Sequence, residues 1–281
     1  MQPDNVSATP ISAASGRRAG SRLRAGWVLG IFLLACPVSW SAAPPPKKPA
    51  DIPMSTLSPK YVDAAQIKLV NARKKFQADT NDIAVAWALG QACFWRGEFA
   101  VDGQERTALA NEGIAVCRTL TLRAPKVPEG HYYLAMNLGQ LARTKWLEAL
   151  GLVRNLEHGL KLAAGMNPRL DHAGPDRCLG LLYRDAPGWP ISLGSKSKAR
   201  THLLRAVELA PDFPENHLVL VETWVMWKEK KTLQHDLAAL AALLPKARKQ
   251  FTGADWEAHW DDWHRRWQEV QAAAAEPLRK K

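Results

Sequence analysis

The clearest signal for the fold is the stretch of residues 214–245, PENHLVLVETWVMWKEKKTLQHDLAALAALLP. Its apolar residues recur at spacings of three and four, as at Leu233, Leu237 and Leu240, and two-residue alternation is nearly absent. This period is typical of helices with one apolar face. The stretch therefore predicts two consecutive helices, the second closed by Pro245.

Similar helix endings recur upstream, at Pro125, Pro168 and Pro211. The four prolines are separated by 43, 43 and 34 residues. Each follows two helical patterns, and other Pro and Gly residues fall between such patterns rather than inside them. The chain is therefore predicted to contain eight to ten helices and no sheet, in helix pairs that bury their apolar faces by stacking on one another.

The order of residues in these pairs resembles the tetratricopeptide repeat (TPR) family, which places Trp, Leu, Gly, Tyr, Ala, Phe, Ala and Pro at fixed spacings. Residues 214–245 fit the register without a gap, as His217, Leu220, Val221, Trp224, Leu233, Leu237, Leu240 and Pro245. Three earlier units fit with inserts, around Leu89-Gly90, Leu138-Gly139 and Leu179-Gly180. Val221 departs from the small residue of the pattern, so looser packing is expected there.

The resemblance implies an all-α fold, an α-solenoid of stacked helix-turn-helix units between helical caps. We expect one repeat domain over residues 58–276. Its units are placed at 81–125, 130–168, 174–211 and 214–245, with an N-terminal cap over 61–77 and a C-terminal capping helix over 252–275.

One unit carries a narrower resemblance. Residues 174–194, with the following 198–207, look like the T-component of bacterial TRAP transporters. That likeness implies an accessory subunit of a solute transporter that works with a periplasmic solute-binding protein.

The N-terminus has the order of a secretory signal peptide: four arginines, an apolar run over 27–38, and small residues over 39–43. The run is about 12 residues, shorter than the ~20 that span a bilayer, so a cleaved leader over 1–41 is favoured over a retained anchor. A Pro/Lys-rich linker over 42–57 follows, and a basic tail over 277–281 ends the chain.

Export to the periplasm is the resulting expectation. Leu33-Leu34-Ala35-Cys36 also resembles a bacterial lipobox, which leaves lipidation of Cys36 as an alternative. Membrane association is expected only if Cys36 is lipidated or the leader is retained.

Composition narrows the function further. The net charge of +11 falls to +8 without residues 1–41, and basic residues are interleaved with acidic ones, which disfavours a nucleic-acid partner. No nucleophile motif and no glycine-rich phosphate loop is present, and His259 and His264 are five residues apart, unlike a zinc-binding pair. We therefore expect no catalytic residue, metal or cofactor, and a protein or peptide as the partner.

The TPR resemblance places the first helix of each unit on the concave wall, where partners bind. Aromatic side chains beside arginines suit a peptide or a ligand with carboxylates. Packing in the core is the alternative for each residue, and the loop around Trp189 is expected to be either a rim or lid of the groove or a structural turn. The candidates are Trp87, Gln91, Phe94, Trp95, Tyr133, Met136, Gln140, Arg143, Arg177, Arg184 and Trp189.

Two further patterns leave alternatives open. Four tryptophans lie on one face of the last helix, which favours a cap packed on the final repeat over a docking stripe, and the charges opposite them, Arg266 included, are expected in solvent. Cys93 and Cys117 occupy facing helices, as buried thiols or, alternatively, as a disulfide. The four tryptophans are Trp256, Trp260, Trp263 and Trp267.

Overall fold

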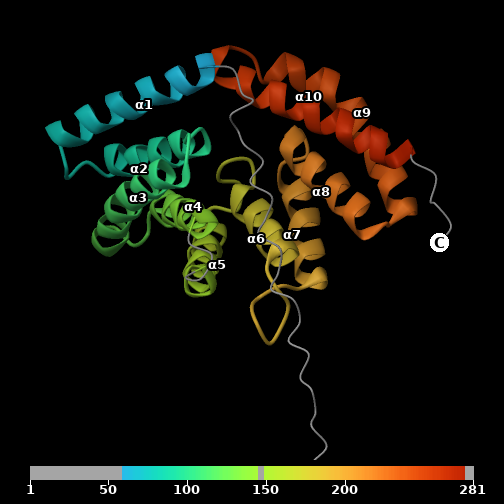
Figure 1. The fold of residues 1–281 in the computed structure, drawn as a ribbon, viewed down its shortest axis with the longest axis horizontal. Helices are drawn as coiled ribbons and strands as arrows, with labels where there is room; N and C mark the ends of the chain where they lie inside the picture. The colour runs from blue at the N-terminus through green and yellow to red at the C-terminus, as the bar shows by residue number, and fades with distance from the viewer. Residues whose placement is uncertain (1–58, 145–148, 276–281) are drawn as a thin grey trace, which may run out of the picture. The chain divides into compact units, whose positions relative to one another are not determined.

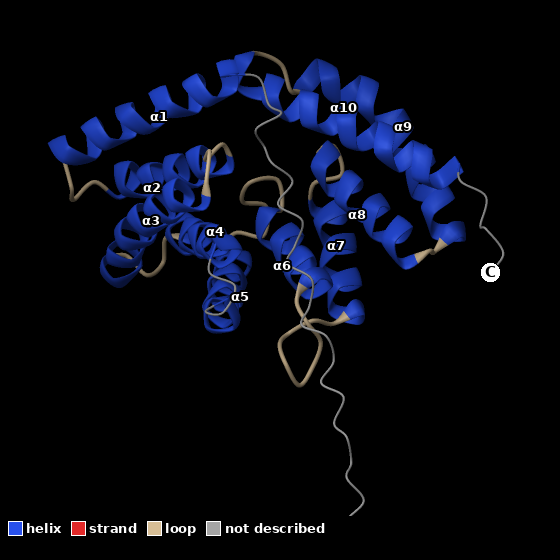
Figure 2. Ribbon diagram, in the orientation of Figure 1, coloured by secondary structure: helices blue, strands red, loops and turns tan. Residues whose placement is uncertain are grey.

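The structure is a computed structural model that describes residues 59–144 and 149–275. The expected leader with Cys36, the linker and the basic tail lie outside the described residues. Within those ranges the chain forms ten helices and no strand (Figures 1 and 2), which confirms the all-α prediction. The helices are α1 (Pro59–Ala78), α2 (Ile83–Glu98), α3 (Gly103–Arg123), α4 (Pro128–Thr144), α5 (Ala149–Met166), α6 (Gly174–Asp185), α7 (Lys196–Leu209), α8 (Pro214–Trp227), α9 (Lys230–Gln250) and α10 (Ala254–Ala275).

Helices next to each other in sequence pack side by side (Figure 1). Four pairs form the repeats, α2 with α3, α4 with α5, α6 with α7, and α8 with α9. The second helix of one pair also packs on the first helix of the next, and α1 packs on α2. This is the stacking of helix pairs that the sequence predicts.

Glycines let the two helices of a pair approach closely. A Cβ atom at Gly90 would lie 2.2 Å from the Cys117 sulfur, and one at Gly180 would lie 2.4 Å from Leu203 Cδ2. Real Cβ atoms do not approach so closely, so any larger residue at either position would force its neighbour to shift. Val221, in the corresponding position of the last pair, is fully buried in the core that α8, α9 and α10 share.

Buried asparagines tie neighbouring repeats together. The Asn137 amide donates to the Gly90 carbonyl at 2.9 Å, and the Asn216 amide donates to the His172 carbonyl at 3.0 Å. Both side chains are almost completely buried. Because an unpaired buried carbonyl is costly, these bonds fix the register between one pair and the next.

Pro245 does not close the second helix of the last unit, contrary to the sequence prediction. Helix α9 continues through it to Gln250. Proline removes one hydrogen bond to the carbonyl four residues earlier. Pro245 faces solvent, however, while Leu244 and Ala247 on either side are buried in the core, and their burial favours continuing the helix.

The tryptophan stripe of α10 is mostly core. Trp260 and Trp263 are 2% and 0% exposed, and Trp256 and Trp267 are half-buried against the same cluster. The helix packs mainly on α8 and to a lesser extent on α9. It therefore covers the apolar face that the last repeat leaves open.

Helix α10 also reaches the first helix of the domain, as Figure 1 shows for their adjoining ends. The Tyr61 hydroxyl donates to the Asp261 carboxylate, and the Lys68 ammonium lies 2.7 Å from Asp255. The two caps of the repeat array are thus in direct contact. Among the described helices, none combines the length and the apolar character needed to cross a membrane.

Candidate partner-binding face

The first eight predicted site residues lie on two neighbouring first helices. Helix α2 carries Trp87, Gln91, Phe94 and Trp95, and α4 carries Tyr133, Met136, Gln140 and Arg143. These helices pack against each other. We call the surface formed by these eight residues the α2–α4 face.

One end of this face is an aromatic and amide group. The rings of Trp87 and Tyr133 are nearly parallel, with centroids 6.1 Å apart, and the Gln91 amide donates to the Tyr133 hydroxyl at 2.5 Å. Tyr133 is buried, while Trp87 and Gln91 are half-buried. Burial raises the pKa of Tyr133, so its hydroxyl stays protonated.

The other end of the face is polar. The Gln140 amide donates to the Glu98 carboxylate, and Arg143 Nη1 lies 3.2 Å from the same carboxylate. Gln140 is 2% exposed, whereas the Arg143 side chain is 36% exposed. Arg143 is therefore the cation of this face that a partner carboxylate can reach.

The middle of the face meets other elements. Phe94 and Trp95 pack edge to face at 5.1 Å between ring centroids, and Trp95 makes the same contact with His259 of α10. The Cys178 thiol of α6 lies 3.5 Å from the Met136 sulfur. Burial lowers the pKa of His259, which favours its neutral ring against Trp95.

Arg177 is not presented to a partner, although the sequence analysis places it on the wall. It is 8% exposed, with Nη1 2.9 Å from Asn216 Oδ1 and Nη2 3.1 Å from Asp171 Oδ2. Its guanidinium also lies over the Phe213 ring, 5.3 Å from the centroid. Arg177 of α6 therefore joins that helix to α8 through Asn216, and its donors are taken up within the chain.

Arg184 is likewise engaged within the chain. Its Nε lies 2.6 Å from the Asp185 carboxylate and its Nη1 donates to the Thr223 hydroxyl at 3.2 Å. The side chain is only 12% exposed. The run of arginines expected from the sequence is thus reduced to Arg143.

Trp189 lies apart from the α2–α4 face. It is 88% exposed in the loop between α6 and α7, which extends beyond the ends of both helices (Figure 1). An indole so exposed covers no groove, so the structure does not show the lid, which was one of the alternatives for this loop.

Cys93 and Cys117 are both buried free thiols, so the alternative of a disulfide is not what the structure shows. Burial raises the pKa of Cys117 to about 12 and raises that of Cys93 as well. Both thiols therefore stay protonated and pack as small apolar groups. The described residues hold no group of side chains arranged to bind a metal ion.

The sequence analysis missed the ion network beneath α10. Arg266, expected in solvent, lies 2.8 Å from Glu215 and 2.6 Å from Glu222 of α8, and the Trp263 indole donates to Glu215 at 2.7 Å. Burial alone would raise the pKa of Glu215, but Arg266 and Arg177 hold it below its usual value. The spacing of seven between the two glutamates, which puts them on one face of α8, is the signal that could have identified this network.

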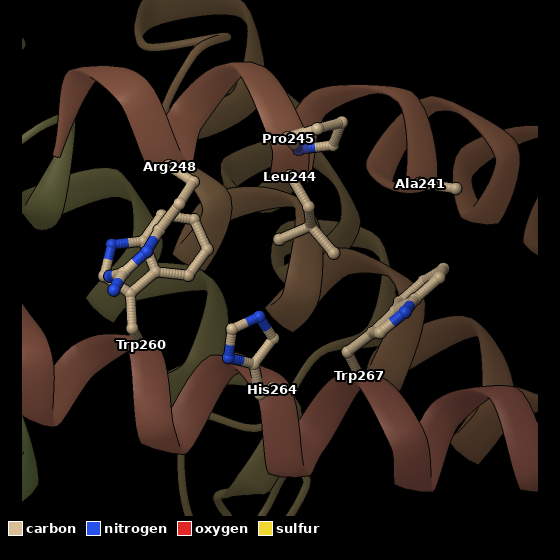
Figure 3. A pocket seen from close by; sticks show the side chains of 7 residues that line it. All are labelled: Ala241, Leu244, Pro245, Arg248, Trp260, His264 and Trp267. Carbon is tan, nitrogen blue, oxygen red and sulfur yellow. The ribbon is translucent and has the colours of Figure 1, made fainter.

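A pocket of about 430 Å³ lies between α9 and α10. Figure 3 shows the His264 ring between the indoles of Trp260 and Trp267. The Arg248 guanidinium lies over the Trp260 ring, 5.0 Å from its centroid. The part of the tryptophan stripe that a docking partner could use is therefore this pocket, which is lined by Ala241, Leu244, Pro245, Arg248, Trp260, His264 and Trp267.

The fold has a counterpart among solved structures. A thermophilic TPR protein of Thermus thermophilus is similar with a TM-score of 0.56 and 19% sequence identity, over 75% of this chain and 92% of that chain. This chain has the TPR fold. No protein-family model matches the chain, and no curated protein matches it either. At this identity the likeness extends to the fold alone, so the function must be argued from the chain's own surfaces.

Proposed function

We propose that the protein is a non-catalytic scaffold that binds a protein or peptide partner on the α2–α4 face. The observation that carries the proposal is a face along two packed first helices, on which half-buried Trp87, Gln91 and Trp95 precede the exposed Arg143 at the polar end. Aromatic rings and arginine are the side chains that contribute most at protein interfaces. A peptide that carries a carboxylate would pair with Arg143 while its apolar groups contact the indoles.

We further propose that binding takes place in the periplasm. The order of basic, apolar and small residues over 1–43 supports export, with cleavage near Ser41. Lipidation of Cys36 would hold the domain at a membrane through the Pro/Lys-rich linker. Mass spectrometry of the protein recovered from an envelope fraction tests this, because cleavage near Ser41 and a lipidated Cys36 give N-termini of different mass.

The scaffold proposal is tested by capture from an envelope extract with the tagged chain and covalent cross-linking. The charge-reversed variant Arg143→Glu, combined with Gln91→Lys, should lose the partner. The control Arg118→Glu lies on an exposed face of the second helix α3 and should keep it. Cross-links that map away from α2 and α4, or equal capture by both variants, would contradict the assignment.

A T-component-like subunit of a TRAP-type transporter is the alternative form of this function. It rests on the resemblance of residues 174–207 quoted above. Recovery of a periplasmic solute-binding protein as the cross-linked partner supports it. Recovery of other partners without a solute-binding protein counts against it and leaves the general scaffold proposal standing.

A further inference from the structure

The loop between α6 and α7 presents an apolar tip to solvent. Trp189 is 88% exposed and Ile191 is 60% exposed, and prolines stand at positions 187 and 190. The contacts described above for the α2–α4 face do not involve this tip. Two large apolar side chains held in water on a protruding loop are unfavourable unless something covers them.

The base of the loop is closed by hydrogen bonds. The Gly194 amide donates to the Pro187 carbonyl at 2.8 Å, and the Ile191 amide donates to the Gly188 carbonyl at 3.0 Å. A Cβ atom at Gly194 would lie 2.1 Å from the Ala186 carbonyl oxygen, so the two ends of the loop approach as closely as glycine allows. The tip is therefore held away from the helices by the backbone, as Figure 1 shows.

Lysines lie beside the C-terminal end of this loop. Lys196 and Lys198 follow it, and the segment from the end of α8 to the start of α9 adds three more, all exposed. The two segments are neighbours, because Lys196 lies 3.0 Å from Glu229 and over the Trp227 ring at 4.8 Å. The three lysines of the second segment are Lys228, Lys230 and Lys231.

The acidic side chains near the lysines are already paired. Glu229 accepts from Arg200 at 2.6 Å in addition to Lys196, and Asp185 is held by Arg184 at 2.6 Å. Arg200 and Lys196 lower the pKa of Glu229, which stays ionised and bound within the chain. A net positive charge therefore remains beside the base of the loop.

We propose that this end of the molecule, the tip of Trp189 and Ile191 with its lysines, binds the surface of an anionic phospholipid bilayer. Tryptophan favours the interface between headgroups and acyl chains, and lysines are attracted to anionic headgroups. Burial of the apolar tip and attraction of the lysines to anionic lipid are two separate contributions, and together they give stable peripheral binding. A protruding apolar tip can insert into a bilayer, and the positive charge of the lysines favours a bilayer with a negative surface charge. The contact needs neither lipidation of Cys36 nor the α2–α4 face, so its failure would leave the scaffold proposal standing.

The test uses the full chain and measures the environment of the loop directly. A single reactive thiol is placed in the loop by Ser192→Cys in a Cys36→Ser background and labelled with a fluorophore that brightens in an apolar environment. Vesicles of phosphatidylglycerol and phosphatidylcholine should shift its emission to the blue, and vesicles of phosphatidylcholine alone should not. The shift should weaken as salt is added, because the lysines act through screened charge.

Two matched variants separate insertion from general adsorption. In the same labelled chain, Trp189→Ser with Ile191→Ser should abolish the blue shift. Val101→Ser with Leu122→Ser, which removes apolar side chains that are 80% and 81% exposed elsewhere, should leave it unchanged. No shift with anionic vesicles, an equal shift with neutral vesicles, or a shift that survives the loop substitutions would overturn the proposal.

Discussion

At the residue scale, glycines decide how closely the helices of a pair approach. The sequence predicts these positions well, because Gly90, Gly139 and Gly180 each follow a leucine in the repeat register. The space available for a side chain differs among these glycines, however. A Cβ at Gly139 would lie 3.3 Å from its nearest neighbour outside its own turn, against 2.4 Å at Gly180. Only the structure shows which of these glycines lack room for a methyl group.

Gly180→Ala is predicted to destabilise the protein by about 1–3 kcal/mol, because the new methyl group overpacks against Leu203, whose backbone nitrogen is only 3.2 Å away. Urea denaturation followed by circular dichroism measures the change. The control Gly165→Ala meets no atom within 4 Å in α5 and should leave stability unchanged or slightly raised. Equal effects of the two substitutions would refute the account of close packing.

Arg266 is the residue whose role sequence reasoning misjudged. A charged residue on a tryptophan-bearing helix looks solvated when only that helix is considered, since the two glutamates that bind it belong to α8. The Arg266 side chain is 15% exposed, so its pairing with Glu215 and Glu222 takes place in partial burial. Contacts between elements distant in sequence are the part of the fold that local patterns do not encode.

Arg266→Ala is predicted to cost about 3 kcal/mol, because it leaves two partly buried carboxylates without a cation. Arg265→Ala, which removes an exposed neighbour paired within its own helix, should cost less than about 1 kcal/mol. Thermal unfolding of both variants at neutral pH gives the comparison.

The same network predicts an acid dependence of stability. The pKa of Glu215 is lower in the folded protein than its ordinary value of 4.5. Its contribution is therefore fully present above that value and is lost as pH falls through the folded pKa. Unfolding measured between pH 6 and about pH 3 should show this loss in the wild type and a smaller loss in Arg266→Ala. Identical pH profiles would contradict the assignment of the shift to Arg266.

The cysteines give a further test at this scale. Burial raises the pKa of Cys178 to about 11 and that of Cys117 to about 12, so thiolates are scarce near neutral pH. The folded domain is predicted to react slowly with iodoacetamide at pH 8, and the unfolded, unreduced protein should show Cys93, Cys117 and Cys178 all alkylated. Intact mass spectrometry counts the alkylated sites. A pair of thiols that stays unreactive until reductant is added would show a disulfide instead.

At the element scale, the ends of helices were less predictable than their existence. Residue periodicity and the proline spacing predicted the helix pairs, since both follow from local packing within the repeat. Pro245 misled the prediction for α9. Its solvent-facing position lets the helix pass, and that position depends on how α9 lies against α8 and α10.

Pro245→Ala is predicted to stabilise the protein by about 1–2 kcal/mol. Alanine restores the backbone donor inside α9 and removes the steric cost of proline in a helix interior, with some offset from a freer unfolded chain. Pro211→Ala is the matched control, because α7 ends at Leu209 and the proline follows it; that variant should be neutral or slightly destabilised. Denaturant midpoints measure both, and a destabilised Pro245→Ala would mean that the helix ends where the sequence suggested.

At the scale of the whole molecule, the candidate site was partly predictable. The repeat register placed Trp87, Gln91, Tyr133 and Arg143 on first helices, and the structure brings the first three together on α2 and α4, with Arg143 at the other end of the same face. The register could not show that Arg177 is used to join α6 to α8, since its partner Asn216 is contributed by the following repeat. Which wall residues remain open depends on the stacking of all the repeats.

The proposed binding of a protein partner to the α2–α4 face can be measured directly. The most direct measurement is the dissociation constant of the captured partner, by calorimetry, for the wild type, for Gln91→Lys with Arg143→Glu, and for the control Arg118→Glu. Binding should be at least about tenfold weaker for the double variant and should change by less than about twofold for the control. Unchanged binding of the double variant, with its fold intact by circular dichroism, would contradict the claim.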